Sequence, residues 1–192
     1  MFIRTLNALR SARFSRREDG SVAIEAAIII PAVFFAFLAI FTVFDAYRQN
    51  SLHQKAAYTI SDMVSRETVP IDNDYLDGAH SLFDTLTRDP QESAIRVSVL
   101  RYDAEGTQMA VDWSQTRGAA DLLDAMDVSE WNTILPVMVD QERIIIVETW
   151  AKYVPPFVTG MGTPQIHNFV FTRPRYAPQV LWEGMEGGFS GS

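Results

Sequence analysis

Apolar residues are most concentrated between positions 26 and 44, where 19 successive residues carry no charge. A helix rises 1.5 Å per residue, so this block would be about 28 Å long, close to the ~30 Å hydrocarbon core of a bilayer. The pattern predicts a single transmembrane helix, which we assign to residues 21–44.

Beyond residue 44 the apolar positions fall largely at spacings of three and four, with polar residues between them. They are Ala46, Leu52, Ala56, Ile60, Met63 and Val64. This spacing is typical of an amphipathic helix that buries one face. We therefore expect one continuous helix from residue 21 to about 68, eased or kinked at Pro31 and ended by Pro70.

Two shorter helices are predicted further along the chain. A stripe of apolar residues indicates a helix over 74–87, with Asn73 or Asp74 as its N-cap. A second short helix is expected over 119–126, with its leucines and methionine facing inward.

The remaining patterns predict a small sheet. Alternating residues on both sides of a turn at 103–106 indicate a β-hairpin. The apolar run within 143–153 is typical of a central strand, and 166–172 alternates as another strand. The expected fold class is α+β, with a long N-terminal helix packed on a mostly antiparallel sheet of about four strands.

Charge is distributed unevenly along these elements. Residues 1–20 carry a net +3, residues 21–44 carry −1, and residues 45–192 carry −10, within a total of −8. By the positive-inside rule, the arginine-rich start stays in the cytoplasm and the acidic body is extracytoplasmic. An acidic body repels nucleic acid, so no nucleic-acid partner is expected.

A cleaved secretory signal and a plain signal anchor are two alternatives for the apolar block. A cleaved signal has a shorter apolar region, of ~7–15 residues, before a small-x-small site. Cleavage after Ala46 would place Phe44 where a small residue is needed. A plain anchor would give no special role to Glu25, which lies at the cytoplasmic edge of the block.

The start of the block also carries a distinctive spacing. A charged leader ends at Gly20, the apolar stretch begins at Ser21, and Glu25 is the fifth residue after the glycine. This resembles the leader of type IV prepilins, which an inner-membrane aspartic peptidase cuts between the residues corresponding to Gly20 and Ser21. Residues 15–50, with Pro31 and a polar and aromatic exit, more narrowly resemble the TadE/TadG-like family. These are the minor pilins, or pseudopilins, of the tight adherence (Flp) system.

The resemblance implies an assembly role for Glu25. In pilins this carboxylate pairs with the new N-terminal amine of a neighbouring subunit, which offsets the burial of both charges. An ionisable residue at the border of an apolar span is itself a functional hypothesis. Ala26 follows Glu25 where the family commonly has an aromatic residue, a departure that concerns peptidase processing rather than the anchor.

The candidate chemistry is sparse. The chain has no cysteine, which excludes disulfides, thiolate metal sites and a cysteine nucleophile. Common hydrolase, phosphate-binding and dinucleotide motifs are missing, and the three histidines lie far apart. The acidic cluster at 72–77 lacks a calcium-loop pattern and is interpreted as helix capping. We therefore expect no catalytic residue, no cofactor, no metal and no small-molecule substrate.

One loop is a candidate docking site for a partner. Residues 154–164 are rich in Pro and Gly and carry Phe157, Val158 and Met161, whose burial is not assured. The aromatic residues elsewhere suffice to fill a core of this size. Residues 184–192 are expected to form a flexible tail, which leaves 45–183 as the α+β domain.

The patterns predict a membrane anchor and an α+β body, and the resemblance implies a pilin-like protein of the inner membrane that acts by protein–protein interaction. It would cross the membrane once, with its body in the periplasm or in the pilus. The expected partners are other pilin subunits, assembly-platform proteins and the prepilin peptidase. Two rival functions stay open: an extracytoplasmic scaffold or sensor unrelated to pili, and an anchored hydrolase without a recognisable motif.

Overall fold

The computed structural model describes residues 19–88, 93–106, 108–121, 123, 128, 131, 134–157, 160 and 162–185. The chain divides into two compact units, Met1–Phe44 and Asp45–Ser192. Most of the predicted leader, residues 1–18, and most of the predicted tail, residues 186–192, lie outside the described part.

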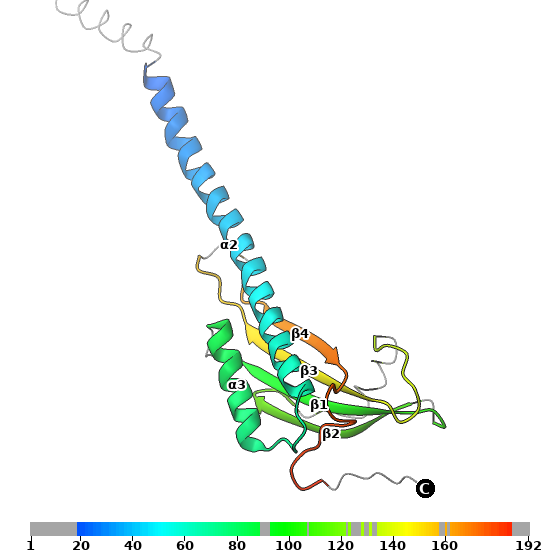
Figure 1. The fold of residues 1–192 in the computed structure, drawn as a ribbon. Helices are drawn as coiled ribbons and strands as arrows, with labels where there is room; N and C mark the ends of the chain where they lie inside the picture. The colour runs from blue at the N-terminus through cyan, green and yellow to red at the C-terminus, as the bar shows by residue number, and fades with distance from the viewer. Residues whose placement is uncertain are drawn as a thin grey trace, which may run out of the picture. The chain divides into compact units, whose positions relative to one another are not determined.

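The first described element is helix α2 (Asp19–Ser65), which continues through Pro31 (Figure 1). The expectation of one long helix is confirmed, although the helix ends three residues before the predicted end. Its last turn tightens, because the amides of Arg66 and Glu67 bond to the carbonyls of Met63 and Val64 at 3.2 Å.

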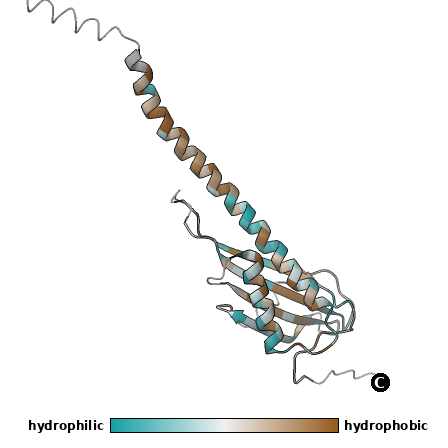
Figure 2. Cartoon of the chain, turned by 60° about the vertical axis from the view of Figure 1, so that its left-hand side comes forward, coloured by the Kyte–Doolittle hydropathy of each residue, from teal (hydrophilic) through white to brown (hydrophobic). Residues whose placement is uncertain are grey.

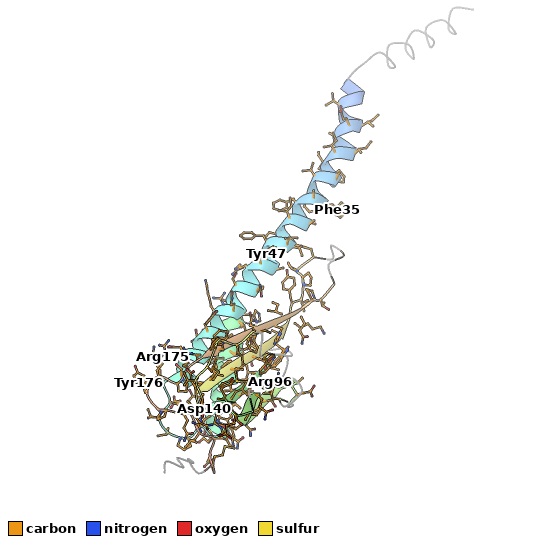
Figure 3. All side chains as sticks on the ribbon, turned by 90° about the vertical axis from the view of Figure 1, so that its right-hand side faces the viewer. Phe35, Tyr47, Arg96, Asp140, Arg175 and Tyr176 are labelled. Atoms are coloured by element: carbon orange, nitrogen blue, oxygen red, sulfur yellow. The ribbon has the colours of Figure 1, made fainter. Side chains whose placement is uncertain are left out.

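In the first unit, α2 is apolar and its large side chains are exposed. Figure 2 shows this stretch as mostly hydrophobic, and Figure 3 shows Phe35 projecting from the helix. The most apolar window has a mean hydropathy of 2.7 and is only 6% buried. The helix is therefore long and apolar enough to cross a membrane, a criterion that an N-terminal signal sequence also meets. Such low burial does not fit the core helix of a soluble domain.

The second unit contains helix α3 (Asn73–Thr87). Its N-cap is Asp72, whose carboxylate accepts the Tyr75 amide at 2.8 Å, so the predicted caps Asn73 and Asp74 were wrong by one or two residues. Asp72 has the extended backbone that an N-cap needs, whereas Asn73 is already helical. The predicted apolar stripe is partly buried, through Leu76, Ala79 and Phe83.

Four strands form one antiparallel sheet in the order β2-β1-β3-β4. They are β1 (Ala94–Asp103), β2 (Gln108–Gly118), β3 (Arg143–Lys152) and β4 (Gln165–Thr172). The predicted hairpin, the central position of β3 and the α+β class are confirmed.

The predicted helix over 119–126 is not formed at residues 119–121 and 123, and its other residues lie outside the described part. Strand β2 instead continues to Gly118, which has a φ of 81°. A Cβ at this glycine would meet the Ser93 carbonyl oxygen at 2.2 Å, so only glycine fits where the chain leaves the sheet.

Each face of the sheet has its own apolar cluster, because successive strand residues point to opposite faces. One face packs against α2 and α3. This cluster includes Ala56, Ile60, Val64, Leu76, Phe83, Ile95, Val97, Val99, Ile145 and Val147. Described residues of the segment between β2 and β3 pack on the other face. That cluster includes Leu100, Val128, Trp131, Leu135, Met138, Ile144 and Ile146.

Residues 180–183 belong to the body. Ile71 and Trp182 form a parallel bridge, and the Trp113 indole donates to the Val180 carbonyl at 2.8 Å. The connection between α2 and α3 is thereby tied to the C-terminal segment.

Candidate functional site

Glu25 lies on an exposed apolar surface of α2. Its neighbours one turn away along the helix are Val22, Ile28 and Ile29, which are 66%, 69% and 50% exposed. Glu25 is itself exposed and forms no salt bridge with another of the described residues. When hydrocarbon or another helix covers this surface, the charged carboxylate loses contact with water, which costs free energy.

The other residues predicted to be functional lie in two separate stretches. Gly20 and Ser21 are the second and third residues of α2, and cleavage between them stays a prediction. Phe157 is 41% exposed, while Val158 and Met161 lie outside the described residues. Gly160 has a φ of 85°, so a side chain there would strain the docking loop.

A buried ion pair that the sequence did not reveal joins the two central strands. Arg96 on β1 and Glu148 on β3 are direct cross-strand partners. The Arg96 Nε donates to Glu148 Oε2 at 2.6 Å, and the two side chains are 8% and 4% exposed. His167 Nε2 lies 3.3 Å from the second oxygen, Oε1. Each carboxylate oxygen of Glu148 thus already has a partner. The pair links β1 to β3, and the carboxylate is not available as a general base.

Aromatic rings enclose this pair. The Arg96 guanidinium lies 5.9 Å from the centre of the Trp131 ring and 5.1 Å from that of Trp150, and Trp150 stacks on His167 at 5.0 Å. Such rings stabilise a cation that water no longer reaches. The tryptophans expected to fill the core therefore also shield a charge.

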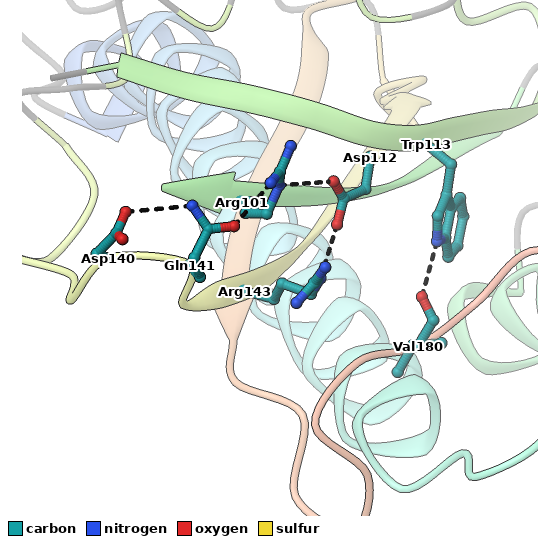
Figure 4. Close-up of polar contacts among 7 residues, drawn as sticks. All are labelled: Arg101, Asp112, Trp113, Asp140, Gln141, Arg143 and Val180. Atoms are coloured by element: carbon teal, nitrogen blue, oxygen red, sulfur yellow. Dashed lines mark hydrogen bonds and ion pairs between the residues drawn. The ribbon is translucent and has the colours of Figure 1, made fainter. Parts of the chain in front are cut away.

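A second charged group lines a pocket of about 370 Å³ on the helix-facing side of the sheet. Asp112 accepts from Arg101 Nε at 3.3 Å and from Arg143 Nε at 2.8 Å, as Figure 4 shows. The nearby Asp140 accepts the Ala104 amide, and this hydrogen bond lowers the pKa of Asp140 below its usual value. The carboxylate of Asp112 is thus already matched by two cations, so it does not present a bare charge to the pocket.

Ser93, which directly precedes β1, and two residues of α3 resemble a hydrolytic triad in composition. His80 Nε2 lies 2.8 Å from Ser93 Oγ, and the Ser93 hydroxyl donates to Asp84. In a working triad, the carboxylate holds the second histidine nitrogen and so orients the base. Here the carboxylate binds the serine hydroxyl instead, so the base-orienting contact is missing.

The three histidines have separate surroundings. His53 is buried with its ring 5.7 Å from that of Phe83, His80 contacts Ser93, and His167 contacts Glu148. Among the described residues, no group of three or more histidine, aspartate or glutamate side chains could hold a metal ion.

No protein-family model, curated protein or solved structure matches this chain. The structure alone therefore defines the class: an α+β body attached to a long helix that is apolar enough to cross a membrane.

The buried pair was missed because 52 residues separate its members. The hairpin predicts which residue of β2 faces Arg96, but nothing local predicts that β3 pairs on the other side. A weak signal was present: Glu148 directly follows the apolar run at 144–147, where an unpaired charge would be costly.

Proposed function

We propose that this protein is an inner-membrane, pilin-like subunit that takes part in assembling a tight adherence (Flp-type) pilus, as a minor component. It crosses the membrane once, with its N-terminus in the cytoplasm and its body in the periplasm, and it acts by binding other subunits rather than by catalysis. The observation that carries the proposal is that Glu25 is the one carboxylate between Gly20 and Asp45, in the part of α2 whose large apolar side chains are exposed.

The resemblance over residues 15–50 supplies the chemistry. Cleavage after Gly20 would make Ser21 the first residue, with a positive amine. In an assembly of parallel helices, Glu25 of one subunit pairs with the amine of its neighbour. Two opposite charges in a poorly screened environment attract far more strongly than they do in water. Pairing also offsets the cost of covering each charge, and therefore selects one axial register between neighbouring helices.

The exposed side chains of the same helix support this mode of assembly. Phe34, Phe35 and Phe37 are 56%, 68% and 62% exposed. Before assembly, lipid covers such a surface, and after assembly neighbouring helices cover it. Glu25 is the one charged residue in 21–44. The free energy of covering its side chain therefore depends most on whether lipid or a neighbouring subunit lies against it.

The test compares Glu25→Ala and Glu25→Gln in cells that make the pilus. We expect both variants to be inserted and stable, as measured by membrane flotation, and both to lose piliation and co-purification with the major pilin. Glutamine keeps the size and hydrogen bonding but not the charge, so an ion pair requires the two variants to behave alike.

Glu105→Gln is the matched control, because it removes one exposed carboxylate from the hairpin turn of the body. It should leave piliation unchanged. Normal piliation in both Glu25 variants would contradict the pilin mechanism and favour the scaffold or sensor alternative. If Glu25→Gln supports piliation and Glu25→Ala does not, the contact made by residue 25 is a hydrogen bond rather than an ion pair.

A further inference from the structure

A small polar pocket in the body has no role in the function proposed above. Its volume is about 200 Å³, and three elements meet there: α2 with Gln49 and His53, the end of α3 with Thr87 and Arg88, and the end of β3 with Lys152 and Tyr153. Figure 1 shows these helices beside the sheet. The volume is below the ~300–1,000 Å³ of pockets that hold drug-sized ligands, so it suits a headgroup-sized molecule.

The pocket has a buried polar floor and a basic rim. His53, Thr87 and Tyr153 are 2%, 1% and 5% exposed, while Arg88 and Lys152 are exposed. None of the described residues that line the pocket is acidic. Since residues 45–192 carry a net −10, a basic hollow stands out against the charge of the body and favours an anionic ligand.

Among the described residues, Asp45 contacts a side chain that lines this pocket. Asp45 accepts the Tyr153 hydroxyl at 3.0 Å, and its other oxygen lies 4.0 Å from an Arg48 nitrogen. Burial and this hydrogen bond raise the pKa of Tyr153 above its usual value, so the hydroxyl keeps its proton as a donor. The charge of Asp45 is therefore partly matched before any ligand arrives.

Arg88 stands at a backbone position where glycine is the usual residue. Arg88 ends α3 in the left-handed conformation, with a φ of 58°. Glycine is the usual residue there because a side chain in this conformation costs energy. The carbonyls at the end of a helix carry partial negative charge, so an anion must be held by side chains. A guanidinium can donate two parallel hydrogen bonds to a phosphate.

The pocket also lies close along the chain to the apolar block. Gln49 follows Phe44 by five residues, which advance about 7.5 Å in a helix. The headgroup layer on each side of a bilayer is roughly 5–8 Å thick. We propose that this pocket binds the phosphate of an anionic membrane lipid, with Arg88 as the principal ligand and Lys152 as the second cation. The inference rests on the membrane anchoring of the proposed function, and not on its pilus assignment.

The experiment uses the full-length chain in vesicles of phosphatidylcholine, with and without phosphatidylglycerol, followed by native mass spectrometry of the extracted protein. We expect one phosphatidylglycerol to be retained in preference to phosphatidylcholine. Arg88→Gln with Lys152→Gln should weaken phosphatidylglycerol binding about tenfold or more. Arg173→Gln with Arg175→Gln is the matched control, which removes the same charge from exposed positions and should leave the preference intact.

Arg88→Gly is the second variant. It removes the guanidinium and places the preferred residue at the left-handed position, so it should fold at least as well and still lose lipid. An unchanged preference in Arg88→Gly and in the double variant overturns the proposal, as does an equal loss in the control pair. Inorganic phosphate at millimolar concentration is the competitor. If it abolishes the preference for phosphatidylglycerol, the proposal is overturned and the pocket is a site for free phosphate.

The outcomes also separate this proposal from the proposed function. Protein that fails to float with vesicles contradicts membrane anchoring, and lipid binding with it. Anchored protein without a lipid preference contradicts the pocket alone, while normal piliation in the Glu25 variants leaves the lipid result standing.

Discussion

The two parts of α2, before and after the boundary between Phe44 and Asp45, have the same backbone but opposite burial. In the first part, apolar side chains such as Ile28 and Phe35 are 69% and 68% exposed. In the second part, Ile60 and Val64 are completely buried in the body's core. Tyr47, which projects from the helix in Figure 3, is 71% exposed just beyond the boundary.

The difference shows that an apolar helical residue does not by itself indicate a core. In the second part, apolar residues occupy one stripe and the sheet covers that stripe. In the first part apolar residues occupy several sides of the helix, and most of their large side chains are exposed. The first part therefore adds no residue to either apolar cluster of the body, whereas the second part supplies a buried stripe to one of them.

The strongest test of this comparison removes the first part. Residues 45–192 alone should form a soluble, cooperatively folding domain, because both apolar clusters consist of residues from that unit. The full chain should require detergent or lipid. Size-exclusion chromatography and thermal unfolding measure the two properties.

An aggregated or molten product from residues 45–192 would contradict the comparison, since it would make the first part of α2 a contributor to the core. Removal of residues 1–18 alone is the matched control. It leaves the apolar block in place and should leave the requirement for detergent unchanged.

The second prediction compares the carboxylates of the two units. Glu148→Gln leaves Arg96 buried without its counter-charge, which should lower the free energy of unfolding by about 3–5 kcal/mol. Glu25→Gln should leave the unfolding of the body unchanged, because Glu25 lies in the exposed apolar part. Urea unfolding followed by tryptophan fluorescence measures both values in detergent.

The double variant Arg96→Met with Glu148→Leu is the control for the buried pair. Because it removes both charges, it should recover most of the stability lost by Glu148→Gln. A Glu148→Gln variant as stable as the parent chain would show that the pair does not lock β1 to β3.

Local patterns were enough to predict most of the fold. The spacing of Ala56, Ile60 and Val64 identified the buried stripe of α2, and the run at 144–147 identified the central strand. The predicted helix at 119–126 is not formed at residues 119–121 and 123, where the chain leaves β2 without regular structure.

The candidate sites were less predictable, for a physical reason. Glu25 could be named as a candidate because its signal is local, a charge beside an uncharged block, and its role stays a prediction. The Arg96–Glu148 pair and the pocket at Arg88 and Lys152 depend on segments that are distant in sequence. Single-sequence patterns report local periodicity and carry no information on which strands become neighbours.

The smallest predicted effect concerns the packing just beyond α2. Burial raises the pKa of Tyr75 well above its usual value of about 10, and the Glu67 carboxylate raises it further. Above pH 10 the unfolded chain loses a proton that the folded chain keeps, so the free energy of unfolding falls as pH rises. Below pH 10 this contribution is fully present. After allowance for screening by solvent, the slope should be several tenths of a kcal/mol per pH unit.

Tyr75→Phe should remove that part of the slope, as measured by urea unfolding of residues 45–192 between pH 8 and pH 11. The pKa of Tyr153 is also raised, by burial and then by Asp45, but Tyr153 is present in both proteins and its contribution cancels in the comparison. Tyr58→Phe is the matched control, since it makes the same change at a position that is 56% exposed. Parallel pH profiles for the parent domain and Tyr75→Phe would mean that the hydroxyl of Tyr75 is as well solvated in the folded domain as in the unfolded chain. We expect the profiles to differ because Tyr75 is partly buried and packs against the helix-facing core.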